Sequence, residues 1–314
     1  SQDPSVGVDL TLLAPDGDGG LEETAKVADL SDGRGVVSAV RFVADRVLIS
    51  TGQFGRGLYV IDVSDPAAPR RAGELTLGTT VGYFHPLPDH RALVVGARSD
   101  EVGEGNQKQY RSWVQAQLLD VADPDAPKVV ATWERPWVAD EVGWDHHAFT
   151  YWPDRELAMW GLRNTEPDSE DAGNPAVVLR AADGLDEVAV PVASEPPEAP
   201  SPCPAVAVSD EVREMIGEDG VVLRCGDEDR EAVEWPRYRC FLVDDATVQR
   251  FAAGEEAQGS FFSCSPAPPP MVRRVLVVSG RPILFSDQTL EALDPSTFRS
   301  AAVAFHPSEA SFGY

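Results

Sequence analysis

Short runs of apolar and β-branched residues, separated by polar turns, extend along most of the chain. One pair of runs lies at residues 37–50 around the turn Ala44-Asp45-Arg46, and similar pairs lie at 84–96, 149–161 and 272–286. Tight polar turns between β-branched runs are typical of β-hairpins. Because convincing helical periodicity is absent from these stretches, the pattern predicts antiparallel strands.

A longer motif repeats within this pattern. The segment LYVIDVSDPAAP at 58–69 returns as AQLLDVADPDAP at 116–127. Each copy is an apolar strand followed by a turn in which Asp binds the backbone ahead of it and Pro cannot extend the ladder. A further strand follows each copy. Together with the hairpin that precedes it, each copy predicts a unit of four short antiparallel strands.

The pattern predicts a propeller. The four-stranded units fall at 36–77, 81–133, 146–190 and 272–305, and a strand pair at 8–27 precedes them. Four-stranded sheets that repeat every roughly 40–60 residues are typical of β-propeller blades. The predicted fold class is therefore an all-β propeller, or a propeller fragment, of about four or five units.

The predicted domains are propeller blades over 1–194, an insertion over 195–270 and a last blade over 271–314. Proline-rich segments on both sides of the insertion mark its boundaries. Within it we expect an α+β fold with short helices at Ser209–Ile216 and Asp245–Ala253 and strands at Val221–Cys225 and Arg239–Val243.

All four cysteines lie in this insertion: Cys203, Cys225, Cys240 and Cys264. An even number in one cluster favours two disulfides and an oxidising compartment. We expect the nested pairing Cys203–Cys264 and Cys225–Cys240, one of three possible connectivities. Free thiols and zinc are the alternatives, and zinc is disfavoured because structural zinc sites usually contain a closely spaced cysteine pair.

The charge of the chain excludes some partners. Asp and Glu number 52 against 26 Lys and Arg, which gives a net charge of −26. A nucleic-acid duplex or an anionic membrane surface requires a basic excess, so cationic partners are favoured. No apolar run is long enough to span a bilayer. The first four residues resemble the remnant of a removed tag, and we expect a native export signal to have been removed as well.

The trio Asp145-His146-His147 is the most site-like feature. Adjacent histidines on a strand point to opposite faces, so only one of them could join Asp145 or His85 as a metal ligand near a central channel. The alternative is a structural histidine that binds a carboxylate or carbonyl at a blade corner.

Five of the seven tryptophans lie between residues 133 and 160. We expect Trp152 and Trp160 to fill the wedge between neighbouring blades. Trp137 and Trp144, in a predicted loop at 134–145, are the better candidates for binding, because exposed tryptophan anchors partners.

The segment Asp16-Gly17-Asp18-Gly19-Gly20 is a weak candidate for a calcium site, through Asp16 and Asp18. It lacks the full calcium-loop pattern, and Asp-Gly is also ordinary hairpin chemistry. His146 is a third weak candidate for metal binding. We otherwise expect no cofactor.

Several motifs resemble those of one family. These are YVIDVSDP at 59–66, FHPL at 84–87, LLDVADP at 118–124 and DHHAF at 145–149. They resemble exported bacterial proteins with a C-terminal β-propeller domain, over roughly 22–190 and 272–303. The resemblance implies an extracytoplasmic propeller, often attached to the cell envelope, and supplies no catalytic residues. The cysteine-containing insertion departs from this family, as does the small number of blades, which could close as a small ring or form an open arc.

The expected function is a non-catalytic, extracytoplasmic module that binds a protein or a cell-envelope component. Its candidate binding residues are Trp137, Trp144, Asp145, His146, His147 and His85. A lactonase-like, metal-dependent propeller hydrolase with a channel site at His85 and His146 is one alternative. A structural part of a larger envelope protein is another.

Overall fold

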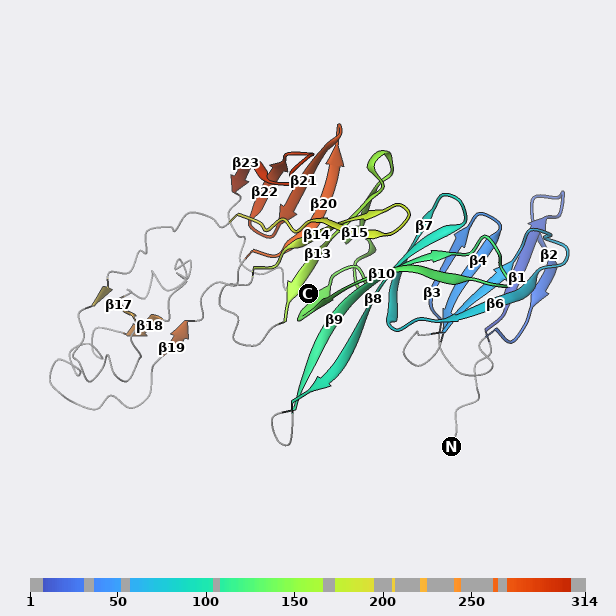
Figure 1. The fold of residues 1–314 in the computed structure, drawn as a ribbon, viewed down its shortest axis with the longest axis horizontal. Helices are drawn as coiled ribbons and strands as arrows, with labels where there is room; N and C mark the ends of the chain where they lie inside the picture. Colours follow the sequence, from blue (N-terminus) through green and yellow to red (C-terminus); the bar gives the residue numbers. More distant parts are fainter. Residues whose placement is uncertain are drawn as a thin grey trace. The chain divides into compact units, whose positions relative to one another are not determined.

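The computed structural model describes most of the repeated units and part of the insertion (Figure 1). The described residues are 8–30, 37–51, 57–103, 108–165, 173–194 and 270–305, together with the backbone of four short strands between 205 and 264. The chain divides into two compact units, one made of 1–194 with 270–314 and the other of 195–269. Within the described residues, no helix has the length and apolar character needed to cross a bilayer.

The first unit consists of antiparallel sheets whose strands follow one another in chain order, so the predicted all-β class is confirmed. Sheet 1 has only two strands, β1 (Leu10–Pro15) and β2 (Leu21–Val27). Sheet 2 contains β3 (Val37–Val43), β4 (Arg46–Thr51), β5 (Gly57–Asp62) and β6 (Arg70–Thr76). Sheet 3 contains β7 (Thr80–Leu87), β8 (Arg91–Val102), β9 (Gln109–Asp120) and β10 (Lys128–Pro136).

Two further sheets complete this unit. Sheet 4 contains β11 (Val138–Asp140), β12 (Thr150–Trp152), β13 (Leu157–Asn164), β14 (Ala176–Ala181) and β15 (Leu185–Ala189). Sheet 5 contains β20 (Val272–Val278), β21 (Arg281–Ser286), β22 (Thr289–Leu293) and β23 (Ser300–Phe305).

Consecutive sheets share apolar cores. Leu30 and Ile49 belong to the core between sheets 1 and 2, and Leu48 and Phe84 to the core between sheets 2 and 3. Trp160 belongs to the next core, between sheets 3 and 4, and Met159 and Val275 to the core between sheets 4 and 5. Trp152 and Trp160 are both buried in these cores, as predicted. No core cluster among the described residues joins sheet 1 or sheet 2 to sheet 5.

The repeated Asp motif closes the same turn in each copy. The Asp62 carboxylate accepts a hydrogen bond from the Ser64 N–H at 3.1 Å, and Asp120 accepts one from the Ala122 N–H at 3.0 Å. The motif therefore has a structural role, because a short side chain that binds the backbone two residues ahead stabilises a turn.

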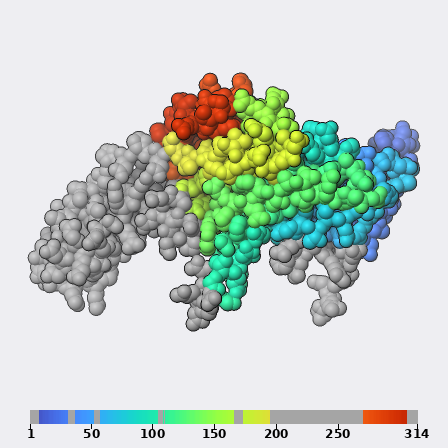
Figure 2. Space-filling view, in the orientation of Figure 1, coloured from blue at the N-terminus to red at the C-terminus, as the bar shows by residue number. Residues whose placement is uncertain are grey.

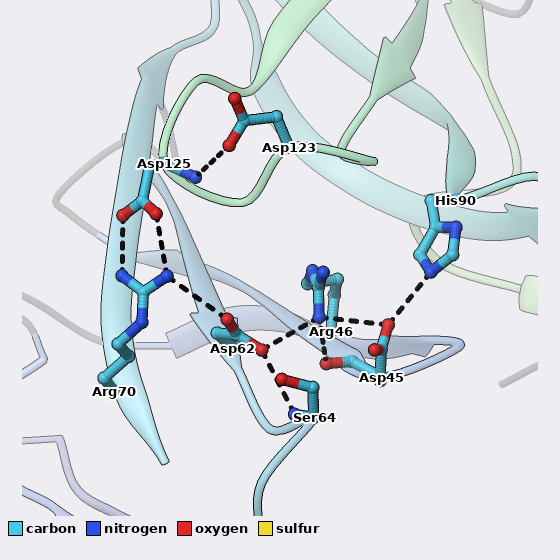
Figure 3. A network of polar contacts seen from close by, with 8 residues as sticks. All are labelled: Asp45, Arg46, Asp62, Ser64, Arg70, His90, Asp123 and Asp125. Carbon is cyan, nitrogen blue, oxygen red and sulfur yellow. Dashed lines mark hydrogen bonds and ion pairs between the residues drawn. The ribbon is translucent and has the colours of Figure 1, made fainter. Parts of the chain in front are cut away.

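The turns of sheets 2 and 3 are also joined to each other by ion pairs (Figure 3). Arg70 donates two hydrogen bonds to the Asp125 carboxylate, at 2.6 and 2.7 Å, and a third to Asp62 at 3.2 Å. Arg46 also binds Asp62, at 2.9 Å. Some of the acidic excess of the chain therefore lies in these turns and is paired with arginine.

Two segments outside the predicted strands contain further strand residues. The segment 97–113, which lies between the predicted hairpin at 84–96 and the second copy of the motif, is mostly a continuation of β8 and β9, which pair from Arg91 and Asp120 out to Val102 and Gln109. This long hairpin projects from the surface in Figure 2. In the predicted loop at 134–145, β10 continues to Pro136 and β11 pairs with β13.

The second unit contains one sheet in the order β16 (Ala205–Val206), β17 (Val221–Arg224), β18 (Cys240–Val243) and β19 (Phe262–Cys264). Cys240 stands opposite Cys264 in the backbone register of β18 and β19. Cys203, Cys225 and the two expected helices lie outside the described residues. The disulfide pairing therefore stays a prediction.

Candidate functional site

An interruption in one edge of sheet 4 carries most of the predicted binding residues. Both β11 and β12 pair with the same edge of β13, β11 opposite Leu162–Asn164 and β12 opposite Leu157–Met159. Only Trp160 and Gly161 separate these two stretches of β13, yet residues 141–149 lie between β11 and β12. This segment, which we call the excursion, must therefore leave the sheet.

The first half of the excursion is a hydrogen-bonded turn. The Asp140 carboxylate accepts a hydrogen bond from the Gly143 N–H at 2.9 Å. The N–H groups of Trp144 and Asp145 donate to the Glu141 carbonyl, at 3.1 and 2.9 Å. Burial raises the pKa of Asp140 and outweighs the hydrogen bond from the Gly143 N–H, which lowers it. The turn holds Trp144 at its surface, where 90% of the residue is exposed.

The second half is a short 3₁₀ turn at His146–Ala148, so the prediction that the two histidines lie on a strand was wrong. Asp145 caps this turn by accepting the His147 N–H at 2.9 Å, and its other oxygen binds Arg274 of β20 at 3.0 Å. Burial opposes ionisation of Asp145, but the His147 N–H and the Arg274 charge outweigh it and lower the pKa of Asp145. Both histidine side chains are exposed.

Behind this turn lies a cluster of rings that includes His85. The Tyr83 ring is 5.4 Å from that of His146 and 4.9 Å from that of Phe149. The His85 ring is 5.0 Å from both Phe149 and Tyr151. The structure therefore brings His85 and His146 to the same aromatic cluster, with Tyr83 between them.

The environment of His85 favours its neutral form. Burial, with a smaller contribution from the Arg41 charge, lowers the pKa of His85 to about 4. The Arg41 guanidinium lies 5.3 Å from the centre of the Tyr83 ring. Among the described residues, no group of three His, Cys, Asp or Glu side chains is placed to hold a metal ion.

We expect the His85 ring to titrate with a midpoint near pH 4 in the folded protein, against an ordinary pKa of 6.5. Because the folded state then binds fewer protons than the unfolded state, stability should fall as the pH drops from 6.5 towards 4. A proton NMR titration measures the midpoint, and His85→Gln should weaken the pH dependence in this window. A midpoint near the ordinary value would show that His85 is solvated.

A cavity lies between the excursion and sheet 5. It measures about 490 Å³ and is lined by Glu141, Asp145, Ala148, Arg273, Arg274, Leu276 and Phe285. Two ion pairs cross it, from Arg274 to Asp145 at 3.0 Å and from Arg273 to Glu141 at 3.8 Å. Leu276 and Phe285 add an exposed apolar surface. The cavity therefore offers apolar contact together with charged groups that are already paired.

The sequence analysis did not predict that sheet 5 forms one wall of this cavity. Arg273 and Arg274 are adjacent basic residues in an otherwise acidic chain, and this was the available signal. They are brought to the excursion by the contact between β13 and β20 across the whole insertion. Local sequence patterns carry no information about this contact.

The other predicted site residues lie elsewhere. Trp137 is half-buried at the junction of β10 and β11, with the Arg111 guanidinium 5.7 Å from its ring. Asp16 accepts hydrogen bonds from the Asp18 and Gly20 N–H groups, both at 2.9 Å, within the hairpin of sheet 1. These are the hydrogen bonds of an ordinary hairpin turn, which is the alternative to a calcium site at this segment.

Comparisons with known proteins agree with the architecture. A family model described as a beta propeller domain matches residues 2–195. An uncharacterized protein from Archaeoglobus fulgidus is 30% identical over 132 residues, which are 41% of this chain and 19% of that protein. Uncharacterized protein MJ1554 from Methanocaldococcus jannaschii is 28% identical over 134 residues, or 43% and 20% of the two chains. The chain thus spans about a fifth of the length of these relatives.

A solved structure, the N-terminal domain of Nup159, aligns over 90% of this chain and 78% of its own, at 11% identity and a TM-score of 0.20.

Proposed function

Since the chain belongs to the β-propeller domain family, we propose that it is a non-catalytic module that binds a protein partner at the excursion and the adjoining cavity. The observation that carries this proposal is Trp144, exposed by 90% on a turn that its own hydrogen bonds hold in place. Tryptophan is enriched among the residues that dominate interface energetics, and a preformed turn lowers the entropic cost of binding.

The cavity beside the excursion suits a peptide-like ligand. Leu276 and Phe285 can cover an apolar side chain, while the carboxylates of Asp145 and Glu141 at the opposite wall are already paired with Arg274 and Arg273. The net charge of −26 attracts a cationic partner over a longer range. We therefore expect the partner to present an apolar anchor flanked by basic residues.

Metal-dependent hydrolysis has less support in this site. Both oxygens of Asp145 are engaged, one by the His147 N–H and the other by Arg274. His85 lies among aromatic rings.

We place the module outside the cytoplasm and at the cell envelope as part of the same proposal. The support is the confinement of all four cysteines to the insertion, which is typical of disulfide-stabilised exported domains. Mass spectrometry before and after reduction counts the disulfides. Four thiols that alkylate without reduction would contradict export.

The binding proposal predicts that Trp144→Ala weakens partner retention at least tenfold, because a central tryptophan contributes about 1.4 kcal/mol or more to an interface. The measurement compares immobilised wild type and variant against a cell-envelope extract, with bound proteins quantified by mass spectrometry. Tyr110→Ala is the matched control, since Tyr110 is 73% exposed on the β8–β9 hairpin. Equal retention by all three proteins would refute the proposed site.

A further inference from the structure

Sheets 4 and 5 enclose a second cavity, which shares no lining residue with the cavity beside the excursion. It measures about 300 Å³, and its walls include Arg155, Leu157 and Arg180 of sheet 4 and Ser296 and Phe298 of sheet 5. Among the described residues that line it, none is acidic, although the chain has 52 acidic and 26 basic residues. We call it the arginine cavity. In the cavity beside the excursion, by contrast, both arginines are paired with carboxylates.

Arg155 is held in a fixed position at this cavity. It is the last residue of a 3₁₀ turn between β12 and β13, and its Nη1 donates a hydrogen bond to the Pro295 carbonyl of sheet 5 at 2.6 Å. Its guanidinium lies 4.8 Å from the centre of the buried Trp152 ring. A guanidinium whose face lies on an aromatic ring keeps the N–H groups along its edges available for hydrogen bonds.

The second arginine, Arg180 on β14, has no acidic partner among the described residues. It stands opposite Leu157 of β13 and opposite Asp186 of β15 in the register of sheet 4. No ion pair joins Arg180 to Asp186, and the Arg180 side chain is exposed. The positive charge at the cavity is therefore not neutralised by the residues around it.

Between sheets 2 and 3, an arginine that faces the next sheet does have a carboxylate partner. The turn between β9 and β10 contains Asp123, which accepts a hydrogen bond from the Asp125 N–H at 3.1 Å. Arg70 of sheet 2 donates two hydrogen bonds to the Asp125 carboxylate, at 2.6 and 2.7 Å (Figure 3). The carboxylate that pairs with Arg70 thus belongs to the residue two positions after the aspartate of an Asp-Pro turn.

Sheet 5 has the same turn without this carboxylate. Between β22 and β23, Asp294 precedes Pro295 and accepts a hydrogen bond from the Ser296 N–H at 2.9 Å. Ser296 therefore occupies the position that Asp125 has in sheet 3. The neighbouring sheet again places arginine at this turn, since Arg155 and Arg180 line the cavity together with Ser296. These two arginines meet a hydroxyl where Arg70 meets a carboxylate.

We propose that the arginine cavity binds an oxyanion, a carboxylate or a phosphate group, in the place that the Asp125 carboxylate has between sheets 2 and 3. Arg155 and Arg180 supply the positive charge and the N–H donors, because the planar guanidinium matches the oxygens of both groups. Leu157 and Phe298 add apolar walls, which reduce the screening of these charges by water. The net charge of −26 repels anions at long range, so binding depends on these short-range contacts.

The test titrates the full chain with sodium phosphate and, separately, with sodium acetate, at a constant ionic strength of about 0.15 M. NMR follows the side-chain Nε–H signals of Arg155 and Arg180. We expect saturable shifts of both signals with at least one of the two ions, and the ion that binds more tightly identifies the ligand as a phosphate or a carboxylate. Arg180→Gln should weaken binding at least tenfold. Arg299→Gln is the matched control, because Arg299 is exposed on the same turn but does not line the cavity.

A further variant, Ser296→Asp, tests the comparison with sheet 3. It brings a carboxylate to the two arginines and leaves both arginines in place, so it should also weaken anion binding at least tenfold. In sheet 3 the same type of turn contains both Asp123 and Asp125, so we expect the turn in sheet 5 to accept a second carboxylate beside Asp294. An unchanged thermal midpoint would confirm that this variant folds.

Two results would overturn the proposal. One is the absence of saturable shifts with both ions. The other is an affinity that stays equal to that of the wild type in either Arg180→Gln or Ser296→Asp, because the ions would then bind to surface arginines in general and not to the cavity.

Discussion

Replacing Trp160 by alanine is expected to lower the free energy of unfolding by about 3–5 kcal/mol. Trp160 is fully buried in the core between sheets 3 and 4. Its ring lies edge-on to Trp133 at 6.0 Å and stacked on Phe149 at 5.9 Å. Truncation opens a cavity between two sheets whose backbones cannot collapse into it. Urea denaturation measures the loss.

The chain offers a matched control in Trp144→Ala, which removes the same number of atoms from a residue that is 90% exposed. Its effect on stability is expected to stay within about 0.5 kcal/mol. Equal losses at the two positions would contradict the burial of Trp160 between the sheets. The same pair separates structure from binding, since only Trp144→Ala is expected to weaken partner retention without unfolding the protein.

A second replacement at the same position refines this expectation. Among the described residues, the Trp160 indole N–H has no hydrogen-bond partner. Trp160→Phe therefore loses volume without leaving a polar partner behind. It should cost clearly less than Trp160→Ala, by the general dependence of stability on cavity size.

The strands and their turns could be predicted because each depends on neighbours in sequence. Asp62 and Asp120 bind backbone groups two residues ahead, and apolar alternation identifies the strands around them. The burial of Trp152 and Trp160 could be predicted from their positions eight residues apart across one such turn. These features repeat because each sheet forms its strands and turns through the same contacts between residues close in sequence.

The site could be predicted only in part, because its parts meet through distant contacts. The sequence singled out Trp144 and Asp145 but placed His146 on a strand. The pairing of both β11 and β12 with β13 is what takes residues 141–149, and His146 with them, out of the sheet. The three-residue β11 is too short to give a recognisable pattern. Arg274 binds Asp145 although 129 residues separate them along the chain. No periodicity in the sequence indicates such a contact.

A substitution at Gly161 tests this distant contact directly. Adding a single Cβ there would place it 2.1 Å from the carbonyl oxygen and 3.1 Å from the carbonyl carbon of Val272. These are backbone atoms of the neighbouring sheet, so the overlap is relieved only if β13 and β20 move apart. We therefore expect Gly161→Ala to lower the free energy of unfolding by about 2–3 kcal/mol, in the upper range for overpacking.

Gly184→Ala is the control, since an added Cβ at Gly184 has no atom within 4 Å. Its expected effect is neutral, or stabilising by up to about 1 kcal/mol because the unfolded chain loses freedom. Denaturation curves of the two variants, measured in parallel, decide whether sheet 5 packs on β13. If Gly161→Ala were as harmless as Gly184→Ala, then β20 would not lie against β13, and Arg273 and Arg274 would no longer form a wall of the proposed binding cavity. The same stability measurement thus bears on the function, because the excursion binds as proposed only where sheet 5 closes the cavity beside it.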